Sequence, residues 1–279
     1  MSLSVPAALR AIQKQLAAVS DAPAREAEWL VEHVTGLNRQ QQRQDAATLS
    51  QAQLQALNEL TKQRTEGRPL AYLLGEQHFW TLRLKVTPAV LIPRSETELV
   101  VERALHHLPK QMAADVLDLG TGSGAIALAV AQERPSTRLL AVDQSSEALC
   151  VATGNAQLNK IGNVDFLRSD WFSAIANRRF QLILSNPPYI AENDPHLEPA
   201  VLAHEPRQAL LSGSDGLDAI RRIVQTAPNF LSPKGWLILE HGWQQASAVR
   251  QLLESAGFSS VASHADLAGH ERVTEAQAA

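Results

Sequence analysis

Residues 116–124, Val-Leu-Asp-Leu-Gly-Thr-Gly-Ser-Gly, join a short apolar run to a turn with glycine at every second position. An apolar stretch through Ile126, Leu128 and Val130 follows directly and predicts a helix. A strand, a Gly-x-Gly-x-Gly turn and a helix in this order let the backbone approach a ligand closely and present free N–H groups to it. The stretch therefore predicts a ligand-binding turn between a buried strand and a helix.

Four further apolar runs alternate with helical stretches along the chain, at residues 139–142, 164–167, 182–184 and 236–239. Strands that alternate with helices predict an α/β fold with a doubly wound, mostly parallel, Rossmann-like sheet. Ligands of such sheets bind beyond the carboxyl ends of the strands. The residues that follow the runs are Asp143, Ser169-Asp170-Trp171, Asn186-Pro187-Pro188-Tyr189 and Glu240-His241-Gly242. They are the candidates for a functional site.

The glycine turn and Asp143 leave two kinds of cofactor open. Gly120, Gly122 and Ala125 fit the loose dinucleotide pattern G-x-G-x-x-A, and Asp143 lies about where that pattern has its ribose-binding acid. The Asp143 carboxylate could equally accept both ribose hydroxyls of S-adenosylmethionine. Trp171, beside Asp170, could pack on an adenine ring in either case.

Asn186, Pro187, Pro188 and Tyr189 predict a rigid platform after a buried strand. The two prolines restrict the backbone and carry no N–H, so the carbonyls there have no neighbouring donor. A planar –NH2 group fits such a site, with one hydrogen on the side-chain oxygen of Asn186, the other on the carbonyl of Pro187, and its flat face against the ring of Tyr189. The platform thus predicts binding of an amide or an exocyclic amine.

An amine clamp favours a methyl donor over a hydride donor as the cofactor. A carboxamide nitrogen is a poor nucleophile because its lone pair is delocalised into the carbonyl. Accepting both of its hydrogens would place electron density on the nitrogen and aim it at a sulfonium methyl group. Catalysis by this platform would rest on orientation and electrostatics rather than on a strong base.

The amino-terminal part of the chain predicts a separate helical domain. Ala27, Leu30, Val31 and Val34 form a helical apolar stripe between the start signal Pro23 and the stop signal Gly36, and Ser50 is a candidate N-cap for a second helix with Leu54, Leu57 and Leu60 on one side. No catalytic constellation occurs within residues 1–75, so we expect a domain that recognises a partner.

Residues 76–93 show a period of two and predict a β-hairpin that joins the two domains. The charged cluster Arg94-Ser95-Glu96-Thr97-Glu98 follows and leads into a helix. Two interpretations stay open for it: a capping box of Ser95 with Glu98, or a lip over the active site.

Composition limits the other classes of function. The net charge is −4, and residues 1–75 hold eight Lys and Arg against seven Asp and Glu, so neither part offers the basic face that non-specific nucleic-acid binding needs. The single cysteine, Cys150, excludes an internal disulfide and is expected to be a buried thiol. The nine His show no metal-ligand spacing, and no apolar run approaches the roughly 18 residues of a membrane span. We expect a cytoplasmic protein without a metal.

On these residues the chain resembles the class I S-adenosylmethionine-dependent methyltransferases that act on amino groups. More specifically it resembles the HemK/PrmC family, which methylates the glutamine of the Gly-Gly-Gln motif in peptide chain release factors. The motifs shared with that family span nearly the whole chain: Arg68-Pro69, Tyr72, Gly75, Phe79, Leu91-Ile92-Pro93-Arg94, Glu96-Thr97-Glu98, Glu205-Pro206-Arg207, Ala209-Leu210, Asp215-Gly216-Leu217 and Gly269-His270-Glu271-Arg272. Ser95 departs from it, because the family usually has proline there.

The resemblance implies S-adenosylmethionine as cofactor and class 1 release factors as partners, with no membrane and no direct nucleic-acid binding. It implies residues 1–75 as a substrate-recognition domain, 76–93 as a linker and 94–279 as the catalytic domain. The residues expected at the cofactor are Gly120, Thr121, Gly122, Ser123, Gly124, Asp143, Trp171 and Asn186. Asn186, Pro187, Pro188 and Tyr189 are expected to hold the substrate glutamine, with Asn186, Pro187 and Tyr189 as the catalytic set.

The sequence leaves two competing functions open. An adenine-N6 methyltransferase could use the same platform, although it would have to flip its base and hold phosphates without a basic face. A non-catalytic adaptor could keep the fold to bind a translation factor, although an intact Asn186 and Asp143 argue against it.

Overall fold

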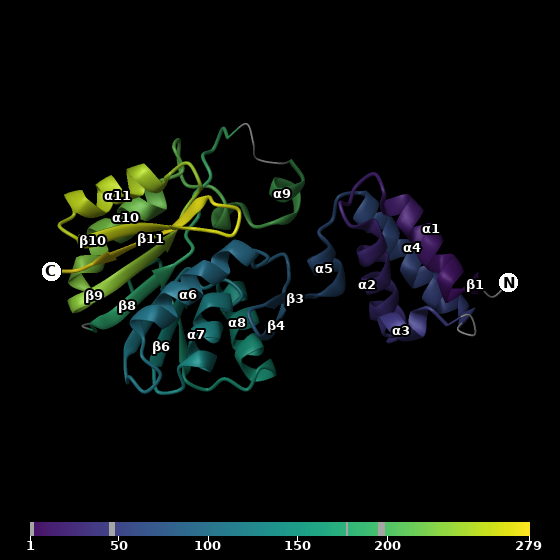
Figure 1. Ribbon diagram of the computed structural model, residues 1–279, viewed down its shortest axis with the longest axis horizontal. Helices are drawn as coiled ribbons and strands as arrows, with labels where there is room; N and C mark the ends of the chain where they lie inside the picture. Colours follow the sequence, from purple (N-terminus) through teal and green to yellow (C-terminus); the bar gives the residue numbers. More distant parts are fainter. Residues whose placement is uncertain (1–2, 45–47, 177, 195–198) are drawn as a thin grey trace. The chain divides into compact units, whose positions relative to one another are not determined.

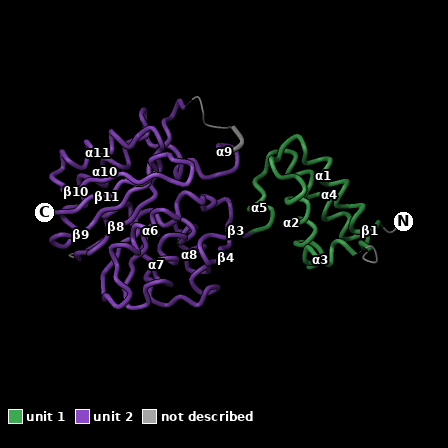
Figure 2. The backbone as a smooth tube through the Cα atoms, viewed as in Figure 1, with its two compact units in different colours: residues 1–75 green, residues 76–279 purple. Residues whose placement is uncertain are grey.

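The computed structural model describes residues 3–44, 48–176, 178–194 and 199–279. The chain forms two compact units, Met1–Gly75 and Glu76–Ala279 (Figure 2). Each has a hydrophobic core of its own.

The first unit is helical. Its elements are β1 (Leu3–Ser4), α1 (Val5–Leu16), α2 (Pro23–Thr35), α3 (Arg39–Gln42), β2 (Thr48–Leu49), α4 (Gln51–Thr65) and α5 (Leu70–Leu74). Helix α2 begins at a proline and ends before Gly36, whose φ of 73° is the left-handed conformation that glycine tolerates in a C-cap. Helix α4 has the predicted N-cap Ser50, which forms a capping box with Gln53.

Apolar stripes of three helices make the core of this unit. Ala27, Leu30 and Val31 of α2 are buried, as predicted, and Val34 is partly buried against them. They pack with one face of α1 and with Leu57 of α4. Helix α1 presents Val5, Ala8, Ile12 and Leu16 at helical spacing, so its buried face also follows from periodicity.

The second unit begins with the hairpin β3 (Glu76–Phe79) and β4 (Leu82–Lys85). The sequence predicted a hairpin that continues to residue 93, but the strand ends at Lys85. Lys85 lies opposite Glu76, where the partner strand β3 begins. The side chain of Asn155 also accepts the Lys85 N–H at 2.7 Å and donates to the Lys85 carbonyl at 3.0 Å. Phe79, Leu82 and Leu84 are buried in the core of the second unit, so the hairpin is part of that unit.

A seven-stranded sheet in the order β10-β11-β9-β8-β5-β6-β7 forms the centre of the second unit (Figure 1). Its strands are β5 (Asp115–Leu119), β6 (Arg138–Asp143), β7 (Val164–Arg168), β8 (Phe180–Ser185), β9 (Leu231–Glu240), β10 (Ser259–Ala265) and β11 (Glu271–Gln277). The five predicted strands are β5 to β9 and pair in parallel. Strands β10 and β11 add an antiparallel edge.

The strand order places a switch point at the centre of the sheet. From β5 the chain builds outward through β6 and β7, then returns to add β8 and β9 on the other side. Strands β5 and β8 are neighbours, with Leu119 opposite Ser185. The glycine turn after β5 and the Asn186 platform after β8 therefore leave the sheet side by side, at the position where open α/β sheets bind ligands.

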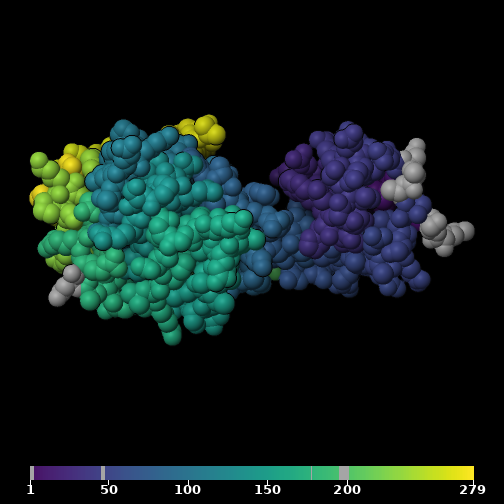
Figure 3. All heavy atoms as spheres, turned by 90° about the horizontal axis from the view of Figure 1, so that it is seen from below, coloured from purple at the N-terminus to yellow at the C-terminus, as the bar shows by residue number. Residues whose placement is uncertain are grey.

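Helices cover both faces of the sheet. Helices α6 (Glu98–His107), α7 (Ala125–Glu133) and α8 (Ser146–Leu158) lie on one face, and α10 (Asp218–Thr226) and α11 (Ala246–Ser255) on the other (Figure 1). Seen from below, the teal segment that carries α7 and α8 covers much of the second unit (Figure 3). Helix α9 (Pro199–His204) and the 3₁₀ turns η1 (Ser95–Thr97), η2 (Arg207–Ala209) and η3 (Ala227–Asn229) complete the unit.

Two structural findings concern the single cysteine and the possibility of a membrane-spanning helix. Cys150 is exposed on α8, so the prediction of a buried thiol was wrong: its position is on the solvent side of the helix, whose buried residues are Ala148, Ala152, Asn155 and Ala156. Within the described ranges, no helix is both long and apolar enough to cross a bilayer.

Candidate active site

A pocket of about 110 Å³ opens at the carboxyl edge of the sheet, and we call it the carboxyl-edge pocket. Of the residues predicted from sequence, it is lined by Gly120, Thr121, Gly122, Ser123, Asp143, Trp171, Asn186 and Pro188. They come from the turns after four consecutive strands of the sheet order, β8, β5, β6 and β7. Gly124, Pro187 and Tyr189 do not line it.

The glycine turn takes its shape from positive φ angles. Gly120 and Gly122 have φ of 71° and 56°, a conformation that side chains with a Cβ rarely adopt. The N–H groups of Gly120 and Thr121 both donate to the Val142 carbonyl at 2.9 Å, which fastens the turn to β6. Gly124 instead serves helix packing. A Cβ there would lie 3.1 Å from Leu128 and 3.3 Å from Ala152, so its lack of a side chain lets α7 and α8 approach.

Asp118, the last acid of β5, lies beneath this turn. Its carboxylate is buried and accepts the Thr121 hydroxyl at 2.6 Å, while its Oδ1 has no partner among the described residues. Burial raises the pKa of Asp118 to about 7, although the bond from Thr121 opposes the shift. Thr121, the partner of this carboxyl, lines the pocket.

Asp143 joins two of the turns at the pocket. Its Oδ2 accepts the Gly122 N–H and its Oδ1 accepts the Ser145 N–H, each at 2.9 Å. A carboxylate oxygen can accept more than one hydrogen bond, so both oxygens keep capacity for hydroxyl donors in the pocket. This half-buried carboxylate is well placed to bind a pair of vicinal hydroxyls.

Trp171 lies on the pocket wall beyond β7. Its φ of 52° is unusual for a bulky residue, and the buried Ser169 supports it by donating to the Trp171 carbonyl at 2.7 Å and accepting the Ala174 N–H at 3.0 Å. A Cβ on Gly120 would lie 3.6 Å from the indole, so the ring covers the glycine turn. A flat aromatic surface thus lies beside Asp143, as an adenine site requires.

Asn186 is oriented by a residue from another element. Its Nδ2 donates to the hydroxyl of Thr97 at 3.1 Å, and Thr97 is buried at the junction of η1 and α6. Within the described part of the chain, neither Oδ1 of Asn186 nor the carbonyl of Pro187 accepts a hydrogen bond. Both acceptors of the predicted amine clamp are therefore available.

Tyr189 connects the platform to β9. Its hydroxyl donates to Oε1 of Glu240 at 3.3 Å, and burial together with the negative charge of Glu240 raises the pKa of the phenol above its ordinary value. Glu240 itself is buried, and burial raises its pKa to about 7 against the hydrogen bonds from Thr97 and Tyr189. The phenol stays protonated near neutral pH and donates a hydrogen bond to Glu240.

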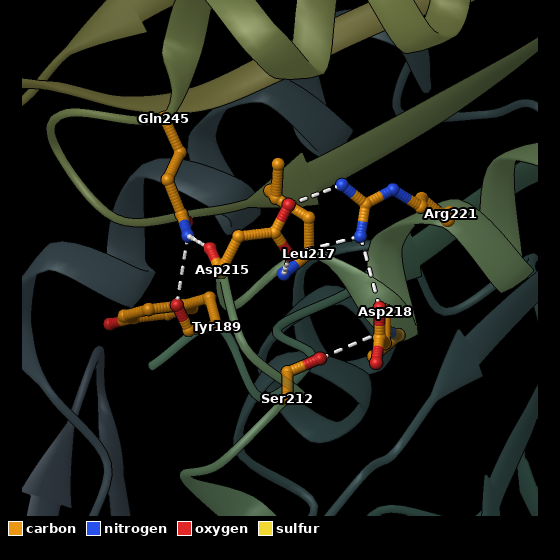
Figure 4. Close-up of polar contacts among 8 residues, drawn as sticks. Tyr189, Ser212, Asp215, Leu217, Asp218, Arg221 and Gln245 are labelled. Atoms are coloured by element: carbon orange, nitrogen blue, oxygen red, sulfur yellow. Dashed lines mark hydrogen bonds and ion pairs between the residues drawn. The ribbon is translucent and has the colours of Figure 1, made fainter. Parts of the chain in front are cut away.

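A network behind Tyr189 holds the platform in place (Figure 4). Gln245 donates to the Tyr189 carbonyl at 2.9 Å and to the Asp215 carbonyl at 3.3 Å. The turn that carries Asp215 is closed by Arg221, which binds the carboxylates of both Asp215 and Asp218. Gly216 lies so close that a Cβ there would be 2.3 Å from the Tyr189 carbonyl oxygen. The position of the platform backbone therefore depends on this turn.

The roof of the pocket is made of two segments that Glu205 joins. Glu205 is buried, accepts the Ile92 N–H at 3.1 Å and forms an ion pair with Arg94. Leu91 and Pro93 on one side and Pro206 and Ala209 on the other line the pocket. This ion pair ties residues 92–94 to the segment that follows α9.

The charged cluster before α6 is not a capping box, and of its residues Thr97 lines the pocket. Ser95 donates to Glu96 at 2.9 Å, and Glu98 accepts the Trp80 N–H at 2.8 Å, so neither caps the helix. Sequence reasoning gave no individual role to Thr97, Ser169 or Glu240. Ser169 and Glu240 each follow a predicted strand, and this position could have marked them as site residues. Thr97 lies in η1, which reaches the edge of the sheet only when the chain folds. Among the described residues no cluster of His, Cys, Asp or Glu could hold a metal ion.

Comparison with known proteins agrees with this geometry. The family model of the methyltransferase small domain matches residues 101–213, and that of the PrmC N-terminal domain matches residues 7–75. The fold resembles the T. thermophilus 16S rRNA N2 G1207 methyltransferase, solved in complex with AdoMet and guanosine, with a TM-score of 0.53 and 20% identity over 73% of this chain and 50% of that one. A methyltransferase from Pyrococcus furiosus gives a TM-score of 0.52 and 17% identity over 70% and 88% of the two chains.

The parallel sheet, the glycine turn and the carboxyl-edge pocket define a class I S-adenosylmethionine-dependent methyltransferase fold. Sequence relatives give the family. Proteins named release factor glutamine methyltransferase are 50% identical in Xylella fastidiosa (strain 9a5c), over 81% of this chain and 82% of that protein, and 47% identical in Escherichia coli (strain K12), over 95% and 96%. The relative from Coxiella burnetii is 44% identical over 99% of both chains. The chain belongs to the release factor glutamine methyltransferase family.

Proposed function

We propose that this protein transfers a methyl group from S-adenosylmethionine to the side-chain amide nitrogen of a glutamine in peptide chain release factors, the glutamine of their Gly-Gly-Gln motif. The observation that carries the proposal is the state of Asn186, which Thr97 holds by its –NH2 end while its carbonyl end remains free. A free side-chain carbonyl next to the free carbonyl of Pro187 is complementary to a carboxamide –NH2.

The residues of the pocket suit the proposed cofactor chemically. Asp143 supplies acceptors for ribose hydroxyls, Trp171 a flat surface for a purine, and Leu91 and Pro93 an apolar cover. S-adenosylmethionine supplies, when bound, an electrophilic methyl group on a sulfonium sulfur. Gly120, Thr121, Gly122, Ser123 and Gly124 would form the turn beneath it, with Gly124 acting through helix packing rather than contact.

The platform would act on the substrate by orientation. Asn186 and Pro187 would each accept one N–H of the glutamine amide, which holds the amide plane and directs the nitrogen lone pair toward the methyl donor. The two accepted hydrogen bonds strengthen as positive charge develops on the nitrogen, so they stabilise the transition state more than the bound substrate. Pro188 would shape the pocket wall. Tyr189, whose hydroxyl is anchored on Glu240, would pack against the amide outside the carboxyl-edge pocket.

The same proposal assigns substrate recognition to the first unit of the chain and catalysis to the second. Residues 7–75 match the PrmC N-terminal domain, and the described part of residues 1–75 holds no catalytic cluster, so we assign this unit to recognition of the release factor. Residues 94–279 would be catalytic, and residues 76–93, which begin with the hairpin β3–β4, would join the two. The relatives are named for release factors, which supports a protein substrate rather than adenine in nucleic acid.

Methylation of purified substrates tests the proposal. The protein is incubated with methyl-labelled S-adenosylmethionine and, in separate reactions, with a class 1 release factor, the same factor with its Gly-Gly-Gln glutamine changed to alanine, and duplex DNA. Mass spectrometry should find one added methyl group on that glutamine in the first reaction and none in the second. Transfer to adenine in DNA, or transfer to the release factor that survives loss of the glutamine, would overturn it.

A further inference from the structure

Exposed apolar side chains gather at one part of the carboxyl edge of the sheet. Trp243 follows β9 and is 52% exposed, and Leu267, in the turn between β10 and β11, is 110% exposed. The ring of Trp243 lies 5.4 Å from that of His270, an exposed residue of the same turn as Leu267. We call Trp243, Leu267 and His270 the edge patch.

The strand order places the edge patch beside the Asn186 platform. Strand β9 is parallel to its neighbour β8, and β11 is antiparallel to β9, so the ends of β8 and β9 and the start of β11 share one edge of the sheet. Neighbouring strands lie about 4.8 Å apart, so β9 and β11 are within roughly 10 Å of β8 across the sheet. The residues that follow β9 and precede β11 are therefore close to those that follow β8.

A side chain connects the turn of Trp243 to the platform. Gln245 accepts the Gly242 N–H at 2.9 Å and donates to the Tyr189 carbonyl at 2.9 Å (Figure 4). The Gln245 N–H also donates to the Gly242 carbonyl at 2.8 Å, which closes the turn around Trp243. The indole is thus presented at a fixed position relative to Tyr189.

The turn of Leu267 is equally well held. Oδ1 of Asp266 accepts the N–H groups of Ala268 and His270, each at 2.9 Å, and the Asp266 N–H donates to the His270 carbonyl at 2.9 Å. Gly269 supplies the φ of 84° that the turn requires. An apolar side chain on an ordered turn loses little conformational freedom when a partner covers it.

The charges around the edge patch are paired with one another. Arg250 forms an ion pair with Glu271 at 3.1 Å, and Arg272 forms one with Asp266 at 3.4 Å. Residues 267–269, Leu-Ala-Gly, carry no charge. The surface therefore suits apolar side chains of a partner better than a charged segment.

We propose that the edge patch is a docking surface that binds apolar side chains of the release factor close to its Gly-Gly-Gln loop. The carboxyl-edge pocket takes up the part of the sheet edge formed by β5, β6 and β7, with Asn186 at its border. A protein whose glutamine reaches Asn186 then lies against the remaining part, formed by β9, β11 and β10. The inference rests on the proposed function, which makes the release factor the molecule that covers this edge.

Binding of a release factor to full-length enzyme provides the test. Titration calorimetry with a factor whose Gly-Gly-Gln glutamine is changed to alanine measures docking without methyl transfer. Trp243→Ala should weaken this binding by about 10- to 100-fold, as expected for a tryptophan at the centre of an interface. Leu267→Gln should weaken it by about 3- to 10-fold, because less apolar surface is lost.

A comparison of binding and rate separates docking from damage to the active site. In single-turnover methylation of intact release factor, Trp243→Ala should raise the half-saturating concentration of the factor and leave the rate at saturation unchanged. Its affinity for S-adenosylmethionine should also stay unchanged, because Trp243 does not line the carboxyl-edge pocket. Met112→Ala is the matched control, since Met112 is an exposed apolar residue before β5, at the opposite edge of the sheet.

Several results would overturn the inference. Release factor affinities of Trp243→Ala and Leu267→Gln equal to that of wild type would do so, as would an equal loss in Met112→Ala. A lower rate at saturation with an unchanged half-saturating concentration would make Trp243 a support of the platform instead. Wild-type enzyme that self-associates in sedimentation, and loses this in Trp243→Ala, would assign the patch to a second copy of the chain.

Two further outcomes keep the test decisive. If Trp243→Ala fails to fold, the fully exposed position of Leu267 allows Leu267→Gln to decide alone. A wild type that binds the release factor through the edge patch but does not methylate it would refute the proposed function and leave the docking surface in place.

Discussion

The carboxylate of Asp143, at the end of β6, accepts the backbone N–H of Gly122 in the turn after β5, at a distance of 2.9 Å. This bond makes Asp143 part of the glycine turn and not only a separate group beside it. A ligand that binds Asp143 therefore also meets a turn whose N–H groups are already directed toward β6. Preorganisation of this kind lowers the cost of ordering the site on binding.

Replacing Asp143 by alanine should weaken binding of S-adenosylmethionine by about 1.5–3 kcal/mol, the range for a lost charge-assisted hydrogen bond. Titration calorimetry on both proteins measures the difference. Asp165→Asn, an exposed change on the neighbouring strand β7, controls for the loss of one negative charge. Equal affinities of wild type and Asp143→Ala would remove this carboxylate from the cofactor site.

Asn186→Ala should reduce the methylation rate by at least about 100-fold, comparable to removal of one positioned polar group from other active sites. Because Asn186 is half-buried and bonded only through Thr97 among the described side chains, the fold should persist. Single-turnover kinetics and circular dichroism check the two statements. Asn229→Ala, at an exposed position of η3, serves as the control, and a rate for Asn186→Ala within a few-fold of it would contradict the clamp.

Gly216→Ala should displace the backbone of the Asn186 platform at Tyr189. A Cβ at this position would lie 2.3 Å from the Tyr189 carbonyl oxygen, and the φ of 77° disfavours any side chain. We expect a loss of about 1–3 kcal/mol in the free energy of unfolding, measured by urea denaturation, together with slower methylation. Gly162→Ala is the matched control, since nothing lies within 4 Å of its Cβ position, and an equal effect of the two would disprove the steric account.

The carboxylate of Glu275 should make stability depend on pH. Burial raises its pKa, but hydrogen bonds from His107 and Arg103 outweigh burial and hold the pKa at about 2, below the ordinary 4.5. A lowered folded-state pKa gives stability above the unfolded value that is lost as the pH falls through the folded one. The difference in unfolding free energy between wild type and Glu275→Gln should therefore shrink from about pH 6 to about pH 3. A difference independent of pH would show that packing and not charge is lost.

Deletion of residues 1–75 should slow methylation of whole release factor while leaving a Gly-Gly-Gln peptide almost unaffected. Remote contacts that position the reacting group produce this pattern. The measurement is kcat/KM for both substrates with full-length and truncated enzyme, after circular dichroism has established that residues 76–279 remain folded. Unchanged activity of the truncated enzyme on whole release factor would show that the first unit does not recognise it.

Much of the fold follows from local patterns in the sequence. The five stretches predicted as strands are β5 to β9, because short, mostly apolar segments between helical stretches are typical of the strands of a parallel sheet. Pro23, Gly36 and Ser50 mark helix ends as predicted, since their backbone preferences and capping atoms act within a few residues. The end of the hairpin at Lys85 was missed because the apolar pattern continues beyond it, whereas the partner strand β3 begins opposite Lys85, at Glu76.

The sequence by itself determined which residues stand at the carboxyl ends of the strands, and hence the glycine turn, Asp143, Trp171 and the Asn186 platform. Only the tertiary structure decided that Thr97 meets Asn186, that Tyr189 meets Glu240, and that Glu205 joins the two roof segments. Strand order is set by how whole faces of the sheet are buried, and no local pattern encodes it. Contacts between residues far apart in the chain, such as Thr97 and Asn186, therefore become visible only once the sheet has formed.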